Sequence, residues 1–187
     1  MEGKRTILIV CGYGCDLNSP LRPYLDRVIM FLKENQPLYT ITCGGFTQRA
    51  KFPHLSEGGM MFKYIMENGP YLGQYFYISE GSYTTPENIK DAGSFIRNSL
   101  QRGTNETFRI TIFCEATRAL RVVTLAQYYL KDLVENVEGD IAVETVSWER
   151  ASPMKEALSI FKDWLSIRIP LVASCIRSKR IRKAKKA

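Results

Sequence analysis

Short apolar runs rich in β-branched residues alternate along the chain with longer stretches in which apolar residues recur every three or four positions. The short runs lie at residues 6–11, 38–43, 75–79, 108–114 and 141–146. Runs of this length, separated by helical patterns, are typical of βαβ units. The pattern therefore predicts an α/β fold with a mainly parallel sheet of about five strands.

The longer stretches predict amphipathic helices, because their apolar positions fall on one side of a helix. They are residues 21–32, a segment from about Ser56, residues 89–100 and residues 122–133. A last helix begins at Ser152-Pro153, and we expect Pro170 to break or kink it. The residues of this helix that we expect to face the core are Ala157, Leu158, Phe161, Trp164 and Leu165.

The length of the chain limits the number of domains that it can form. It has 187 residues, of which 45% are hydrophobic, which is enough for one core and short for two domains. We expect a single domain over residues 1–176. No stretch reaches the roughly 20 apolar residues that cross a bilayer, and Met1 leads into the first apolar run without a cleavable leader. These features predict a soluble, cytoplasmic protein.

Positive charge is concentrated at the end of the chain. The formal net charge is +7, and residues 177–187 contain seven Lys and Arg and no acidic residue. Subtracting these seven from the 26 Lys and Arg leaves 19, which equals the 19 Asp and Glu. We expect residues 177–187 to be a frayed or disordered basic tail that can touch a membrane or another polyanion. Since the body is neutral, nucleic-acid binding is not expected.

The five cysteines include no CxxC pair and are accompanied by a single histidine, His54. Neither a disulfide framework nor a zinc site fits this pattern, and no metal is expected. Cys11, Cys43 and Cys114 end predicted buried strands, where a thiol packs as a small hydrophobe. Pairing of His54 with Cys43 or Cys15 is the less favoured alternative.

In a parallel sheet with right-handed crossovers, the loops after the strands lie on one edge, where ligands bind. Gly12 and Gly14 follow the first predicted strand at the place of a phosphate turn, but Leu17 occupies the position of the third glycine. The second strand ends in Gly44-Gly45 rather than an acidic residue, and the chain has no GxxxxGK[ST] motif. Classical NAD binding and P-loop chemistry are therefore not expected, and the glycines of the first loop can also serve a tight turn alone.

Three further motifs at this edge have both a structural and a binding interpretation. Gly44-Gly45 either makes a turn or lets backbone N–H groups approach an anion. Ser56 can cap the helix that it begins, and Thr84 with Glu87 can make a capping box. Each motif also places polar groups where a ligand would lie.

The run after the fourth strand places Arg118 and Arg121 three residues apart on the first turn of a helix. Both guanidinium groups would share one face, which suits a phosphate or a carboxylate. The alternative is that the two arginines neutralise Glu115 or face solvent.

Taken in order, these motifs resemble the YdcF-like family, which includes the SanA and ElyC envelope proteins and is largely a domain of unknown function. The most specific is the run EGSYTTPEN at residues 80–88, which matches the family pattern E-x-S-x-x-T-x-E-N. The resemblance covers roughly residues 6–133. The other matching features are the first glycine loop, Arg27, Gly44-Gly45 and Ser56-Glu57.

The chain departs from the family pattern after the fourth strand. The family has a histidine there, followed three residues later by an arginine. Arg121 matches the arginine, whereas Arg118 occupies the position of the histidine. Any proton transfer assigned to the family histidine would not run unchanged in this chain.

The resemblance implies a Rossmann-like three-layer sandwich whose strand ends hold a small anionic or nucleotide-like ligand, with S-adenosylmethionine as a candidate cofactor. The expected ligand-binding residues are Gly12, Gly14, Arg27, Gly44, Gly45, Ser56, Glu57, Glu80, Ser82, Thr85, Glu87, Asn88, Arg118 and Arg121.

Three functions are open on the sequence alone. The first is an enzyme of unassigned reaction, in which Arg118 and Arg121 hold the anion and Glu57 or Glu87 moves protons. The second is a non-catalytic binding or regulatory module linked to envelope or metabolite homeostasis. The third is a methyltransferase, for which the resemblance is the sole support.

Overall fold

The computed structural model describes residues 4–18, 20–69, 75–100, 107–136, 139–147 and 153–186. At its centre is a five-stranded sheet with the order β3-β2-β1-β4-β5, in which every strand pair is parallel. The strands are β1 (Arg5–Cys11), β2 (Tyr39–Cys43), β3 (Tyr75–Ser79), β4 (Phe108–Glu115) and β5 (Asp140–Val146). The prediction of an α/β fold with a parallel sheet of about five strands is confirmed.

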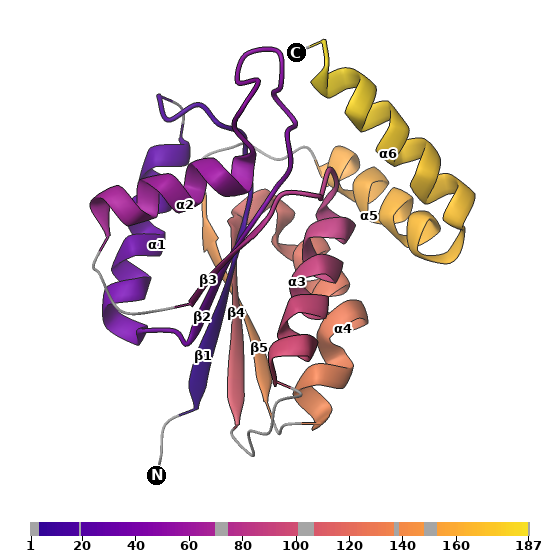
Figure 1. Ribbon diagram of the computed structural model, residues 1–187. Coiled ribbons are helices and arrows are strands. Elements are labelled where there is room, and N and C mark those ends of the chain that lie inside the picture. Colours follow the sequence, from indigo (N-terminus) through magenta and orange to yellow (C-terminus); the bar gives the residue numbers. More distant parts are fainter. Residues whose placement is uncertain are drawn as a thin grey trace.

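Helices cover both faces of the sheet, which makes the fold a Rossmann-like three-layer sandwich (Figure 1). One layer holds α1 (Leu21–Asn35) and α2 (Glu57–Asn68), and the other holds α3 (Thr85–Leu100) and α4 (Ala119–Asn136). A 3-10 turn, Ala116–Arg118, joins β4 to α4. Two further helices, α5 (Pro153–Arg168) and α6 (Pro170–Ala184), form a hairpin beside the second layer.

The central strand β1 shows why both faces need a helical layer. Ile7 and Ile9 pack with residues of α3 and α4, whereas Leu8 and Val10 pack with residues of α1 and α2. All four side chains are fully buried. Because successive side chains of a strand point to opposite faces, a strand buried on both faces is apolar throughout, which is the pattern that the sequence shows.

The face of α5 that was predicted to lie inward lies outward. Leu158, Phe161 and Trp164 are 51%, 56% and 47% exposed, Ala157 is exposed as well, and Leu165 is half-buried. The side that faces α4 instead carries Asp163, which is buried and forms an ion pair with Arg121 of α4. Apolar periodicity gives no sign of a carboxylate that faces inward, so the pattern predicted the wrong side of the helix.

Residues 177–184 belong to helix α6, where the sequence predicted a frayed tail. The predicted break at Pro170 is confirmed: Ile169 separates the two helices, and Pro170 takes the first position of α6, where its missing N–H is harmless. Ala184, in the last turn, is buried. The basic end of the chain is therefore part of the folded body, and α6 extends beside the end of the sheet at which the strands finish (Figure 1).

No helix in the described part of the chain is long and apolar enough to cross a bilayer.

Candidate functional site

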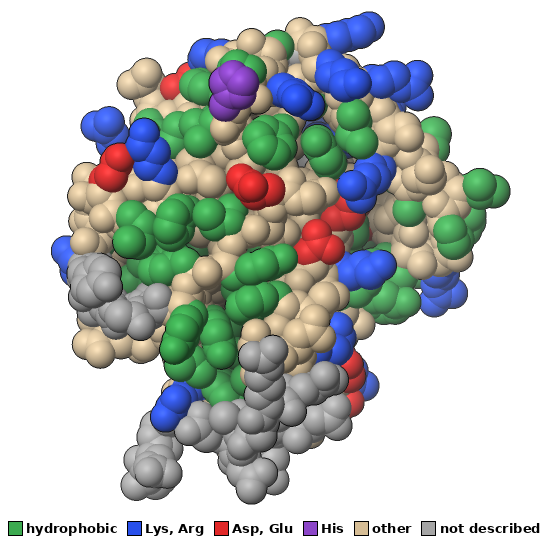
Figure 2. Space-filling model, in the orientation of Figure 1, with side chains coloured by type: hydrophobic (Ala, Val, Ile, Leu, Met, Phe, Trp, Pro, Cys, Tyr) green, Lys and Arg blue, Asp and Glu red, His purple; other side chains and the backbone are tan. Residues whose placement is uncertain are grey.

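The direction in which the chain adds strands to the sheet reverses between β1 and β4. From β1 the chain continues through α1 to β2 on one side, whereas β4 continues through α4 to β5 on the other side. Open parallel sheets bind ligands at such a reversal of strand order, because the loops diverge there. Lys and Arg side chains gather over this end of the molecule, at the top of Figure 2.

Glu57 occupies the middle of this edge, and glycines on two neighbouring loops make room for it. Ser56 caps α2 as predicted, since its Oγ accepts the N–H of Gly59 at 2.8 Å, and the cap places Glu57 in the first turn. A Cβ on Gly12 would collide with the Glu57 carboxyl oxygen. Gly44 has φ +144°, and a Cβ there would lie 2.7 Å from Cβ of Glu57. These glycines therefore serve close packing against Glu57.

The surroundings of Glu57 favour its protonated form. Burial raises the pKa of the carboxyl group, and this effect outweighs the hydrogen bonds that it accepts from the Thr47 hydroxyl and the Gly14 N–H. The positive charges of Arg118 and Arg180 act in the opposite direction and lower the pKa. A carboxyl group that keeps its proton to a higher pH than an ordinary glutamate is better suited to acid–base chemistry.

The paired glycines at the end of β2 do not present free N–H groups to a ligand. The N–H of Gly44 donates to the carbonyl oxygen of Ser79 at 2.9 Å, and that of Gly45 donates to Ser82 at 2.6 Å. A Cβ on Gly45 would lie 2.6 Å from the same Ser82 oxygen. Gly44-Gly45 thus joins the loops after β2 and β3, a structural role that differs from the simple turn considered from the sequence.

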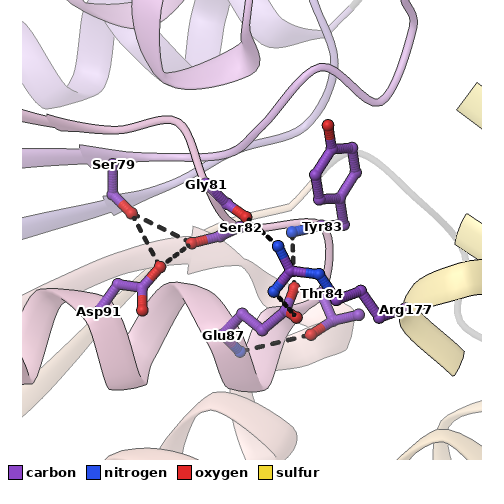
Figure 3. Close-up of polar contacts among 8 residues, drawn as sticks. All are labelled: Ser79, Gly81, Ser82, Tyr83, Thr84, Glu87, Asp91 and Arg177. Carbon is purple, nitrogen blue, oxygen red and sulfur yellow. Dashed lines mark hydrogen bonds and ion pairs between the residues drawn. The ribbon is translucent and has the colours of Figure 1, made fainter. Parts of the chain in front are cut away.

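The loop after β3 is held by its own side chains. The Ser82 hydroxyl is buried, donates to Asp91 Oδ2 at 2.6 Å and lies 3.1 Å from the Ser79 hydroxyl (Figure 3). The Ser56 hydroxyl donates to a carboxyl oxygen of Glu80, which ties this loop to the start of α2. Ser82 and Glu80 therefore have partners within the protein.

Glu87 has two roles in the structure. It belongs to the predicted capping motif, since its N–H donates to Thr84 Oγ1 at 3.4 Å and its Oε2 accepts the N–H of Tyr83 at 2.7 Å. Its other oxygen accepts a hydrogen bond from Arg177 Nη1 at 2.8 Å (Figure 3). The neighbouring Thr85 is half-buried, and Asn88 is buried with its side-chain oxygen unpaired in the described structure.

The last residue of β4, Glu115, supplies a buried carboxyl group, and the 3-10 turn that follows supplies a half-buried cation, Arg118. One oxygen of Glu115 accepts the N–H of Thr117 at 2.9 Å and its hydroxyl, while the other is buried without a partner in the described structure. The Tyr13 hydroxyl accepts the N–H of Glu115 at 2.7 Å. The Arg118 guanidinium lies 4.2 Å from the centre of the Tyr13 ring, and it has no ion-pair partner among the described residues.

Arg121 and Arg27 do not join this cluster. Arg121 forms a bidentate ion pair with Asp163, and both side chains are largely buried. It therefore fixes α5 to α4. Arg27 is exposed along α1, whose residues Leu25, Val28 and Ile29 face the sheet.

The cysteine pattern offers no activated nucleophile. Burial raises the pKa of Cys11 and of Cys15 to about 12, and the Cys43 pKa is also raised. Sγ of Cys15 lies 3.6 Å from the carbonyl oxygen of Leu55, whereas the side chain of His54 is exposed. The prediction that Cys11, Cys43 and Cys114 are buried thiols is confirmed.

Several residues at this edge were not predicted from the sequence. They are Tyr13, Thr47, Asp91, Arg177 and Arg180. Tyr13 stands between the two glycines of the first loop, which is a signal that could have been used. Arg177 and Arg180 are three residues apart in the basic tail, the spacing that places two side chains on one helix face. The contact of Arg177 with Glu87, 90 positions earlier in the chain, could not be deduced from local pattern.

Comparison of the chain with models of known protein families, with curated proteins and with solved structures found no match. The resemblance to the YdcF-like family stays a prediction.

Proposed function

We propose that the protein binds a small anionic ligand, bearing a phosphate or a similar group and nucleotide-like in shape, at the carboxyl ends of β1 and β4. The observation that carries the proposal is Arg118. Its half-buried guanidinium is stacked on Tyr13 and, among the described residues, lacks a carboxylate partner. A cation that is partly removed from water in this way is normally paired, so an anionic ligand is the partner that its chemistry calls for.

A second cation approaches the same place from α6. Arg180 is exposed, and its charge acts on the carboxyl group of Glu57, as that of Arg118 does. Since both arginines act on one carboxyl group, an anion beside Glu57 would experience both charges. This supports a ligand with more than one negative charge, such as a phosphate monoester or a nucleotide.

We further propose that the protein is an enzyme in which Glu57 transfers a proton to or from the bound molecule. The raised pKa of Glu57 supports this role, because the carboxyl group keeps its proton to a higher pH than an ordinary glutamate does. The bond that is made or broken is unassigned. S-adenosylmethionine belongs among the ligands to be tested, on the strength of the YdcF-like resemblance.

The test is a thermal-shift screen of nucleotides, sugar phosphates and S-adenosylmethionine with the wild type and two variants. Arg118→Gln removes the half-buried cation, and Arg109→Gln is the control, since Arg109 is an exposed partner of Asp140 at the opposite end of β4. A ligand at a hundred times its Kd stabilises by about 2.7 kcal/mol, which shifts Tm by about 5–10 °C. We expect this shift in the wild type and in Arg109→Gln and its loss in Arg118→Gln.

Two outcomes would contradict the proposal. One is the absence of a shift with every compound, and the other is a shift of the same size in Arg118→Gln. Once a ligand is found, Glu57→Gln separates the enzyme from a binding module. If the protein is an enzyme, Glu57→Gln should still bind the ligand but should no longer convert it. If the protein is a binding module, the wild type itself should retain the ligand unchanged, as native mass spectrometry would show.

A further inference from the structure

The α5–α6 hairpin presents apolar side chains to solvent. Met154, Leu158 and Phe161 of α5 are 74%, 51% and 56% exposed. Their spacing of four and three residues places them along one side of the helix. At the turn of the hairpin, Leu171 adds a further apolar side chain that is 82% exposed. Neighbouring apolar residues on a surface mark a place of contact with another molecule.

Aromatic side chains give this surface a rigid part. The rings of Phe161 and Trp164 are stacked, with centres 6.2 Å apart and planes at 15°. The Arg168 guanidinium lies 4.6 Å from the centre of the Trp164 ring. Aromatic rings next to cations are frequent where a protein meets the interface between lipid and water.

Cations without acidic partners border the apolar stripe. Lys155 and Lys162 of α5 are seven residues apart and so lie on the same side of the helix, next to the stripe. Both are exposed, as is Arg168, and none of the three has an ion-pair partner among the described residues. As far as the described residues go, these three cations are therefore available to an outside partner.

Helix α6 adds a second set of cations on its outer side. Arg177 and Arg180 point toward the candidate site, whereas Lys179, Arg182 and Lys186, spaced by three and four residues, share the opposite side. These three residues are exposed, and α6 contains no acidic residue. In Figure 2, hydrophobic side chains lie at the right edge, over the turn of the hairpin, with Lys and Arg side chains above and below them.

We propose that the α5–α6 hairpin docks on the surface of a membrane that contains anionic lipids. The apolar stripe enters the headgroup region, and the cations of both helices meet the lipid phosphates. The helices lie on the surface, in keeping with the finding that no described helix is fit to cross a bilayer.

Two other occupants fit the surface less well. A second copy of the chain would bring the same patch onto itself, and the cations that border the stripe would then repel one another. A nucleic acid would use the cations, but it would leave exposed the side chains of Met154, Leu158 and Leu171. A membrane with anionic lipids satisfies both the charge and the apolar surface.

The experiment is flotation of the full chain with vesicles of phosphatidylcholine, with and without phosphatidylglycerol. We expect binding only to the anionic vesicles, weakened by salt because salt screens the cations. Lys179→Glu with Arg182→Glu should lower affinity by at least about twentyfold, since each cation near an anionic surface contributes about fivefold. Phe161→Ser with Leu171→Ser should lower it by about tenfold.

Matched controls lie on the opposite layer. Met30→Ser removes an exposed apolar side chain of α1, and Lys33→Glu reverses an exposed charge of the same helix. Both should bind as the wild type does. Circular dichroism would test whether each variant is folded.

The proposal is overturned if the wild type does not bind anionic vesicles, or binds neutral ones equally well. It is also overturned if the serine variants bind with full affinity, because the contact would then be electrostatic alone. A wild-type dimer that Phe161→Ser converts to a monomer, without vesicle binding, would assign the stripe to a second copy of the chain.

Discussion

Glu57 shows how one carboxyl group links the site to stability. Its pKa in the folded state lies above the ordinary value of 4.5, so the folded protein holds this proton more tightly than the unfolded chain does. The free energy of unfolding then falls as pH rises from about 4.5 through the folded-state pKa. We expect Glu57→Gln to flatten this dependence and to be more stable than the wild type at neutral pH, as measured by urea unfolding across the range. Glu34→Gln, on the exposed side of α1, is the control, and an unchanged slope in Glu57→Gln would contradict the assignment.

The pair formed by Arg121 and Asp163 is a second single-residue feature with a measurable effect. Both side chains are about nine-tenths buried, so removal of one leaves the other as an unpaired charge. We expect Arg121→Met to lower the free energy of unfolding by about 3–5 kcal/mol, and Arg121→Met with Asp163→Leu to recover most of the loss. Urea unfolding measures both changes. A double variant as unstable as the single one would show that the unpaired charge of Asp163 is not the cause of the loss.

At the scale of elements, α6 is attached to the body near the candidate site through Arg177. The guanidinium donates to Glu87 at 2.8 Å and to the carbonyl oxygen of Gly81 at 3.3 Å. Because these contacts are partly exposed, each contributes a modest amount, on the order of 0.5–1 kcal/mol. We expect Arg177→Ala to speed hydrogen exchange of the α6 amides by about two- to fivefold, with Arg182→Ala as an outward-facing control. Equal exchange in the two variants would show that Arg177 does not hold the helix.

The elements differ in how far local sequence determined them. The strands were predicted closely, because a parallel strand buried on both faces must be apolar along its length, as Ile7 to Val10 are. The cap of α2 at Ser56 followed from its residue type alone. The inner side of α5 was predicted wrongly, because the residue that fixes it is Asp163, whose partner lies 42 positions away.

The candidate site divides in the same way. Gly12, Gly44, Ser56 and Glu57 were expected at the edge of the sheet from their place after strands, and the structure brings them together. The contribution of α6 was not expected, because a run of cations carries no local sign of the carboxylates that it meets. A run of Lys and Arg at the end of a chain predicts a solvated tail, unless the distant carboxylates that it contacts are known.

For the whole molecule, the cysteines report on cooperative unfolding. Cys11, Cys15, Cys43 and Cys114 are buried, and only Cys175 is exposed. Burial also raises the pKa of Cys11 and Cys15 to about 12, which keeps the reactive thiolate scarce. We expect one thiol to react with a disulfide reagent at once and four to react at the rate of global opening, on absorbance measurement. A second fast thiol would indicate local opening of the sheet or of the first loop.

The place of Cys175 has a use beyond stability. It lies on the exposed side of α6, two residues before Arg177, which faces the carboxylates of the candidate site. A fluorescent probe attached there requires no engineered thiol and no removal of the others. Its emission would register, in one cuvette, whether α6 changes its surroundings when an anion binds at the candidate site, when the hairpin meets a vesicle, or in both cases.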